Sequence, residues 1–318
     1  MTPSKPVYVG IDTSKAQLEV AIGQTIAPPV DNTRAGIGTL IARLPKDVAL
    51  VVIESTGCYS QLAANLLAAA GYRVAVVQPG RIKHYARSQG LLAKTDRIDA
   101  RIIAQFGEHS PGLVIYQEPS EARKRLRALV DRRDQVVEDR VREENRLEAC
   151  LDTTIQKHLK ASIARLRKAD VQLARHIDAL IKADGEMSAI FTILESMKGV
   201  GSLTAANLLA HLPELGCVNR QEIAALAGVA PYNNDSGPRQ GQRSIYGGRQ
   251  RVRSAMHMAA VSASRHDENM ASFYRRLLDR GKPTKVALVA VVRKMLIKLN
   301  GLVADYRKTI VQPAAVTS

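Results

Sequence analysis

The sequence predicts an α/β domain at the N-terminus followed by a mainly helical remainder. Strand-like and helix-like segments alternate over residues 1–110. Residues 121–194 contain one glycine and no strand pattern, and they consist mostly of helix formers with dense mixed charge. Beyond them the chain is helical and basic. We therefore expect three functional parts, namely an α/β domain at 1–110, a coiled-coil-like helical spacer at 111–194 and a mainly α domain at 195–318.

The first strands and helix of the α/β domain follow directly from hydrophobic patterning. Residues 7–11 follow an alternating pattern and consist mostly of strand-forming residues, which predicts a first strand. Residues 17–22 predict a second strand after a short turn, so we expect the chain to begin with a hairpin. Apolar residues at helical spacing predict a helix over 37–44, which Pro45 ends. The continuous apolar run at 48–53 predicts a strand that is buried on both faces.

Alternation of helix and strand continues through the rest of this domain. Residues 61–70 form a predicted helix that Gly71 closes, and residues 73–77 form another short strand. A third helical segment follows Lys94 and Thr95, with three apolar residues on one face, Ile98, Ile102 and Phe106.

The spacer predicts two long helices. The second helix carries a heptad pattern that a single charged residue interrupts: Leu159, Ile163, Leu166, Asp170, Leu173, Ile177 and Leu180. Such a pattern is typical of helices that pack along one seam. A helical hairpin within the chain and a dimerising coiled coil would both bury this seam, and the sequence leaves both open.

A glycine-containing turn joins two apolar helical stretches, residues 190–197 and 205–212, in the manner of a helix-hairpin-helix. In Gly199-Val200-Gly201 the backbone can turn tightly with its N–H groups exposed beside a helix N-terminus. This arrangement binds a phosphate without reading base sequence. A simple turn between two helices is the alternative.

Helix signals continue in the basic domain. The spacing of Asn219 and Glu222 is typical of a capping box, and Gly228 ends that short helix. A further helix begins near Arg249. Steps of four align Arg249, Arg253 and His257 on one face, while three apolar residues face inward, Val252, Met256 and Ala259.

Four carboxylates lie where they can converge. Asp12 follows the first strand and Glu54 follows the buried strand, whereas Asp96 and Asp99 are three residues apart and share one helix face. Such a cluster repels itself unless it holds hard cations, and oxygen ligands suit Mg²⁺ or Mn²⁺ in phosphoryl transfer. Each acid taken alone is also explained as a helix cap or a solvated charge.

Ser236 lies in a turn-forming segment of the basic domain, residues 230–241. Arginines follow it closely, at positions 239, 243, 249, 251 and 253. A hydroxyl beside clustered guanidinium groups can attack a phosphodiester whose developing charge those groups stabilise. The alternative is a loop serine next to arginines that bind phosphates, which we expect of Arg239, Arg243, Arg249 and Arg253.

The charge balance favours a polyanionic partner. The chain holds 46 Lys and Arg against 30 Asp and Glu, a net charge of +16, and residues 216–318 contribute +11 of it with 17 basic and 6 acidic side chains. A local excess of this size suits a face that neutralises phosphates, although basic surfaces also bind acidic proteins and anionic lipids. Aromatic residues make up only 4%, which weakens a base-stacking platform as the mode of binding.

Other sequence features bear on the compartment. Three cysteines far apart, Cys58, Cys150 and Cys217, predict neither a disulfide framework nor a zinc site. The chain starts without a signal-like apolar stretch, and no apolar run reaches the roughly 18 residues that span a bilayer. We therefore expect a cytoplasmic protein that does not interact with a membrane.

Five motifs in order along the chain resemble one family. They are G-I-D-T-S-K at 10–15, I-E-S-T-G at 53–57, K-T-D-R-I-D-A at 94–100, G-V-G at 199–201 and A-P-Y-x-x-D-S-G at 230–237. Together they resemble the DEDD transposases of bacterial insertion sequences, which are relatives of the Piv-type site-specific invertases.

The resemblance implies a RuvC-like domain of the RNase H type, in which Asp12, Glu54, Asp96 and Asp99 bind Mg²⁺. It also implies that Ser236 attacks a DNA phosphate to give a covalent phosphoserine intermediate before strand exchange and religation. Family members act on donor and target DNA under the guidance of a structured RNA from the element itself. They assemble as dimers that pair into tetramers, with the acids and the serine of different protomers in one composite centre.

Two other functions compete with this one. A structure-selective nuclease of the Holliday-junction type would use the acids alone, with Ser236 structural. A nucleic-acid scaffold would use neither. The sequence does not specify the target site, the guide RNA or the ends of the element.

Overall fold

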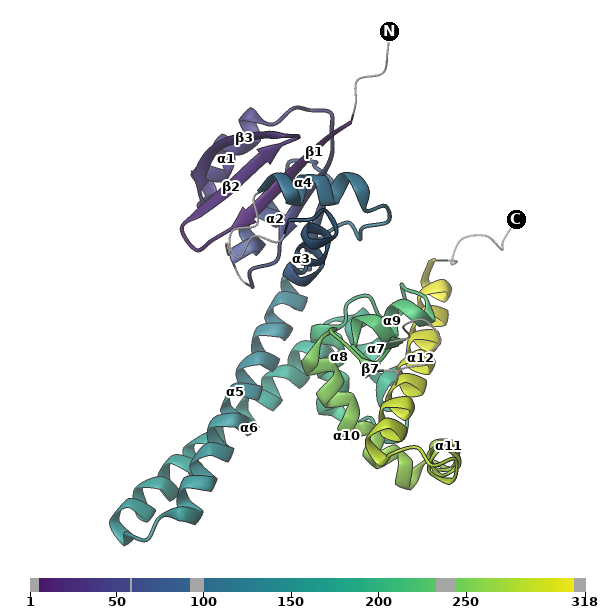
Figure 1. The fold of residues 1–318 in the computed structure, drawn as a ribbon. Helices are drawn as coiled ribbons and strands as arrows, with labels where there is room; N and C mark the ends of the chain where they lie inside the picture. The colour runs from purple at the N-terminus through teal and green to yellow at the C-terminus, as the bar shows by residue number, and fades with distance from the viewer. Residues whose placement is uncertain (1–5, 58, 92–99, 233–243, 312–318) are drawn as a thin grey trace, which may run out of the picture. The chain divides into compact units, whose positions relative to one another are not determined.

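A computed structural model gives the fold of the chain (Figure 1). The structure describes residues 6–57, 59–91, 100–232 and 244–311. The chain forms two compact units, residues 1–119 and 120–318. Most of the segment expected to be a spacer, 111–194, belongs to the second unit. Cys58 and Ile98 lie outside the described residues.

The first unit is built on a mixed five-stranded sheet with the order β3-β2-β1-β4-β5. β1 (Val7–Thr13), β2 (Gln17–Ile22) and β3 (Thr25–Asp31) are antiparallel neighbours, which confirms the predicted opening hairpin. β4 (Val48–Glu54) and β5 (Val74–Val77) run parallel to β1, as expected for strands joined by helical crossovers.

Helices cover both faces of the sheet (Figure 1). α1 (Arg34–Arg43) and α2 (Tyr59–Ala69) share one apolar core with the sheet, and α3 (Pro79–Ser88) and α4 (Ala100–His109) share another. Residues of β4 alternate between these cores because successive strand side chains point to opposite faces. The two faces of β4 thus explain why its sequence is a continuous apolar run.

Two elements of this unit escaped the sequence reading. β3 contains Pro28 and Pro29, which remove backbone donors, and prolines are tolerated there because β3 is an edge strand. α3 begins with Pro79 at the first helical position, where the missing N–H costs nothing. Prolines in a sequence favour a loop at both segments. Only the fold shows at which positions a backbone N–H group is not needed for a hydrogen bond.

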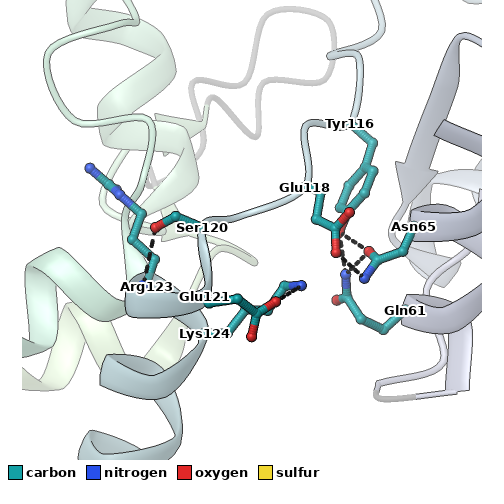
Figure 2. Close-up of polar contacts among 8 residues, drawn as sticks. All are labelled: Gln61, Asn65, Tyr116, Glu118, Ser120, Glu121, Arg123 and Lys124. Atoms are coloured by element: carbon teal, nitrogen blue, oxygen red, sulfur yellow. Dashed lines mark hydrogen bonds and ion pairs between the residues drawn. The ribbon is translucent and has the colours of Figure 1, made fainter. Parts of the chain in front are cut away.

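The first unit ends in a small set of polar contacts (Figure 2). The Tyr116 hydroxyl donates to the Asn65 amide oxygen over 2.5 Å, and the Asn65 amide nitrogen donates to Glu118 over 2.7 Å. The Tyr116 backbone N–H also donates to the Val74 carbonyl of β5 over 2.6 Å. These bonds tie the chain between α4 and residue 119 to α2 and to the sheet.

The second unit begins with two long helices, α5 (Glu121–Ala149) and α6 (Thr153–Ala183), which pack against each other (Figure 1). Ser120 caps α5 by accepting from the Arg123 backbone N–H (Figure 2). Asp170, the charge in the α6 heptad pattern, forms an ion pair with Arg133 of α5 at 2.8 Å. The hairpin within the chain is thus observed, whereas dimerisation through it stays a prediction.

The remaining helices of the second unit enclose one large apolar core. α12 supplies a buried row at helical spacing that includes Val291, Met295 and Leu299. No described helix is long and apolar enough to cross a membrane. The elements are α7 (Gly185–Glu195), α8 (Ser202–His211), α9 (Arg220–Leu226), β6 (Pro231–Tyr232), β7 (Ser244–Ile245), α10 (Gln250–His266), α11 (Glu268–Asp279) and α12 (Thr284–Val311).

Candidate active site

Asp12 and Glu54 come together at one edge of the sheet. β1 and β4 are parallel neighbours, and the last pair of their register is Ile11 with Ile53. The two acids are the next residues of their strands. Because side chains alternate along a strand, Asp12 shares the face of Gly10, and Glu54 shares the face of Val52. The predicted convergence of these two carboxylates is therefore built into the register.

Helix α4 packs on this same face at contact distance. A Cβ atom at Gly10 would lie 2.1 Å from the Ala100 carbonyl oxygen, so only glycine admits the start of α4 here. Further along α4, a Cβ at Gly107 would lie 2.6 Å from the Val52 Cγ2 atom. The start of α4 thus lies against β1 two residues before Asp12.

Two threonines hold the ends of β1 and β4 together. The buried Thr13 hydroxyl donates to the Glu54 carbonyl oxygen over 3.1 Å and is also in hydrogen-bond contact with the Thr56 hydroxyl. Both lie in the motifs G-I-D-T-S-K and I-E-S-T-G. They fix the backbones that carry the acids, a role that the sequence reading did not assign to them.

Glu54 is a half-buried acid beside a second acid. Burial, and then the negative charge of Asp12, raise the pKa of Glu54. Its Oε2 atom is buried and, among the described residues, has no hydrogen-bond partner. A buried carboxylate oxygen beside a second acid is a suitable ligand pair for a hard cation.

The other two predicted ligands, Asp96 and Asp99, lie outside the described residues. Within residues 6–57, 59–91, 100–232 and 244–311, no group of three or more His, Cys, Asp or Glu side chains is arranged to hold a metal. The register also places Glu19 of β2 directly opposite Asp12. The hairpin that the sequence predicts offered a signal for this extra negative charge.

The segment that carries Ser236 is closed at its base by a short hairpin. β6 and β7 pair Pro231 with Ile245 and Tyr232 with Ser244. Three predicted site residues between these strands, Ser236, Arg239 and Arg243, lie outside the described residues.

Glycines anchor this hairpin base to α9. Gly228, Gly247 and Gly248 all have positive φ, and a Cβ at Gly248 would lie 2.1 Å from the Gly228 backbone nitrogen. The Arg253 side chain donates to the Gly247 carbonyl oxygen over 2.7 Å. Backbones in contact at this point leave little freedom for the chain that follows β7.

Arg249 is held by the protein itself. Its Nη1 and Nη2 atoms donate to the two carboxylate oxygens of Glu214 over 2.5 and 2.6 Å, and Nη1 also donates to the His211 carbonyl oxygen over 3.1 Å. Burial acts to raise the pKa of Glu214, but the bonds and charge of Arg249 outweigh it, and the pKa is lowered. Arg249 therefore stabilises the start of α10 through a paired charge.

The Gly-Val-Gly turn lies between α7 and α8, which contact each other. Gly199 has a positive φ and packs against α10, where a Cβ would lie 2.6 Å from the Ala259 carbonyl oxygen. Val200 is buried and its N–H donates within the turn to Met197, whereas Gly201 is exposed at the N-terminus of α8. Gly199 thus has a packing role, and phosphate binding at this turn stays a prediction.

Two family models match the chain. The DEDD transposase model of the IS110 type, described as "Transposase", matches residues 9–156. A second, described as "Transposase IS116/IS110/IS902 family", matches residues 191–275. The chain belongs to the IS110 family of transposases. The first match spans the four acids predicted as metal ligands, and the second spans the glycine turn, Ser236 and the arginines after it.

Proteins similar to this IS110-family transposase include a gene-inverting protein and proteins of insertion elements. The pilin gene-inverting protein of Moraxella lacunata is 29% identical over 253 residues, which is 77% of each chain. The insertion element IS116 44.8 kDa protein of Streptomyces clavuligerus is 26% identical over 95% of each chain. The insertion element IS900 42 kDa protein of Mycobacterium paratuberculosis is 25% identical over 99% of each. This transposase is therefore an enzyme of insertion sequences that acts on DNA.

Proposed function

We propose that this transposase cuts and rejoins donor and target DNA through a covalent phosphoserine formed at Ser236, with Asp12, Glu54, Asp96 and Asp99 as a Mg²⁺ site of a RuvC-like domain. The observation that carries the proposal is the pair of acids at the ends of β1 and β4, one of which has a buried carboxylate oxygen without a hydrogen-bond partner in the part of the chain that the structure describes. The mixed sheet covered by helices on both faces supports the RuvC-like assignment.

Oxygen ligands suit a divalent cation, and the order of residues along the chain also supports grouping the four acids. Asp99 is bonded to Ala100, whose carbonyl oxygen packs on β1 at Gly10. Since Gly10 precedes Asp12 on the same strand face, the helix pair enters our proposal as the remaining two ligands. A divalent cation here, Mg²⁺ or Mn²⁺, would stabilise the negative charge that develops on the reacting phosphate in the transition state. The protein's part is to hold Glu54 and Asp12 close together and oriented toward it, and the positive charge of the cation would favour their ionised forms.

The covalent step conserves the phosphodiester. The Ser236 oxygen forms a bond to phosphorus, the bond from phosphorus to one deoxyribose oxygen breaks, and the proton of the serine hydroxyl ends on that leaving oxygen. The freed hydroxyl of a partner strand can then attack the phosphoserine and release the serine. No external energy source is needed, because an ester replaces an ester. This economy suits an enzyme that rejoins what it cuts.

Arginines around Ser236 have two roles in this proposal. Arg239 and Arg243, together with the turn at Gly199 and Gly201, bind phosphates of the nucleic acid. Arg249 and Arg253 are joined to Glu214 and to the Gly247 carbonyl, so a phosphate would have to displace these partners. We assign them mainly to positioning the segment that carries the nucleophile.

The resemblance to DEDD transposases also supports a structured guide RNA and a dimer that assembles to a tetramer. The long α5–α6 hairpin supports the dimer by presenting exposed apolar side chains, among them Val141, Ile155 and Val171. A protein that recombines bacterial DNA works in the cytoplasm, where that DNA lies.

Trapping on a suicide DNA substrate, with the RNA of the element present, tests the serine. The wild-type protein should form a covalent adduct that resists denaturation, and Ser236→Ala should form none and lose recombination at least about 1,000-fold. DNA cutting that persists in Ser236→Ala would assign the chemistry to the acids alone, as in a Holliday-junction-type nuclease.

Replacement of an acid tests the metal site and the scaffold alternative together. Asp12→Ala should abolish recombination while salt-sensitive DNA binding changes less than about twofold, because the acid contributes no attraction to phosphates. Recombination at the wild-type level in this variant would show that the metal site is not needed, and would favour a nucleic-acid scaffold.

A further inference from the structure

The end of the second unit carries a concentration of basic side chains that the proposed chemistry does not use. Residues 273–298 contain eight basic residues and one acidic residue. Seven of the basic side chains are exposed: Arg275, Arg276, Arg280, Lys282, Lys285, Lys294 and Lys298. Among the described residues, none of the seven forms an ion pair with a carboxylate.

Phe273 joins the basic faces of two helices. Lys294 of α12 places its Nζ atom 4.6 Å from the centre of the Phe273 ring, and Arg276 of α11 places its Cζ atom 5.5 Å from the same centre. Arg280 is the C-cap residue of α11, four residues after Arg276, and Lys298 lies one turn after Lys294 on α12. We name these four exposed cations, Arg276, Arg280, Lys294 and Lys298, the α11–α12 cationic stripe.

The chemistry of the stripe fits a phosphate backbone rather than exposed bases. Two cations attracted to one ring repel each other, and a polyanion relieves this repulsion while it releases its own counterions. The half-buried ring packs against the apolar core and already contacts both cations, so it offers little free face on which a base could stack. The stripe is therefore suited to contact that does not depend on base sequence.

The stripe also differs from the arginines near the serine segment. Arg249 and Arg253 donate to internal acceptors, and Arg251 pairs with Asp131. The cations of the stripe have no such partners among the described residues and remain available to a ligand. Its residues begin at Arg276, directly after the second family match ends at residue 275.

We propose that the α11–α12 cationic stripe is a docking surface for the sugar-phosphate backbone of double-stranded DNA. Double-stranded DNA is the occupant because the family acts on DNA and because the stripe presents phosphate-binding groups in two rows without a stacking platform. The assignment rests on the proposed function only in taking DNA as the partner. It requires neither the serine nucleophile nor the metal site.

A fluorescence anisotropy titration tests the stripe. The full chain in a Ser236→Ala background, which removes the covalent step, is titrated onto a labelled DNA duplex of mixed sequence at several salt concentrations between about 50 and 200 mM. The stripe variant carries Arg276→Gln, Arg280→Gln, Lys294→Gln and Lys298→Gln. The slope of log association constant against log salt concentration is negative, and loss of four phosphate contacts should make it shallower by about 3 to 4. Binding near 100 mM salt should weaken at least about tenfold.

A matched variant on α6 removes the same charge elsewhere in the second unit: Lys157→Gln, Lys160→Gln, Arg165→Gln and Lys168→Gln. These four are also exposed and, within the described residues, without ion pairs. Binding by this control should stay within about threefold of the parent, and both variants should unfold at the parent's temperature. Equal losses in the two variants, an unchanged slope in the stripe variant, or a loss confined to an RNA duplex of the same length would each overturn the proposal.

Discussion

The ends of β1 and β4 in the first unit and the base of the serine segment in the second treat charge in opposite ways. At the strand ends, Glu54 is half-buried beside Asp12, and its buried Oε2 atom has no hydrogen-bond partner among the described residues. At the hairpin base, Arg249 is held by both oxygens of Glu214 and by a backbone carbonyl. The first arrangement costs folding free energy and the second supplies it.

This difference distinguishes charged side chains that can bind a ligand from charged side chains that stabilise the fold. A charge without an opposite partner among the described residues is available to a ligand of opposite sign, which we propose to be a cation at Glu54 and a phosphate at the α11–α12 cationic stripe. A charge with an internal partner fixes the scaffold, as Arg133 does with Asp170 between α5 and α6. Net charge alone does not distinguish these cases, because a paired and an unpaired arginine count equally in it.

The largest expected effect comes from removing the uncompensated acid. Glu54→Gln should lower recombination at least about 1,000-fold, since a metal ligand is lost. The same variant should stabilise the metal-free protein by about 0.5 to 1 kcal/mol. The sign follows from the raised pKa: the ionised Glu54 present at neutral pH is less favourable in the folded than in the unfolded chain. Thermal unfolding and a recombination reporter measure the two effects.

Mg²⁺ sharpens this test. Added Mg²⁺ should raise the unfolding temperature of the wild type but not of Glu54→Gln, because a ligand stabilises only the state that binds it. Asp47→Asn, which removes an exposed carboxylate from the same unit, is the control and should behave as the wild type. Wild-type recombination in Glu54→Gln would show that the uncompensated acid is not part of the site.

A smaller effect is expected from breaking a paired charge in the scaffold. Asp170→Leu leaves Arg133 partly buried without its partner, and the free energy of unfolding should fall by about 3 kcal/mol. Replacing both residues with leucine should recover most of this loss, since an apolar pair continues the heptad seam. Urea unfolding measures both variants. A double variant as unstable as the single one would contradict the assignment of this pair as replaceable scaffold.

The smallest effect concerns the clamp at Arg249. Glu214→Gln should cost about 1 kcal/mol at neutral pH, a value that allows for the partial exposure of both side chains. The lowered pKa of Glu214 means that its contribution is present above its ordinary value of 4.5 and is lost as the pH falls through the lower folded value. Urea midpoints from pH 7 to pH 3 should therefore converge for wild type and variant. Glu195→Gln, an exposed carboxylate of the same unit, should show no such convergence.

Much of the fold could be predicted from local pattern. The strands at 7–11, 17–22 and 48–53 are confirmed within two residues, because their apolar residues either alternate or form an uninterrupted run. The capping box of Asn219 and Glu222 is present with both of its hydrogen bonds, since it depends on four consecutive residues only. Features that involve distant partners, such as the edge position of β3, have no local signature.

The sequence by itself determined the chemical inventory of this transposase: acids after the strands, a serine among arginines and an excess of positive charge. Only the tertiary structure decided which charged side chains pair with one another. Arg249 meets Glu214 35 residues away, and Arg133 meets Asp170 37 residues away, whereas Lys294 and Arg276 lie against an aromatic ring and form no ion pair within the described residues. Such pairings depend on how helices pack, and packing brings together residues whose spacing in the chain carries no trace of the contact.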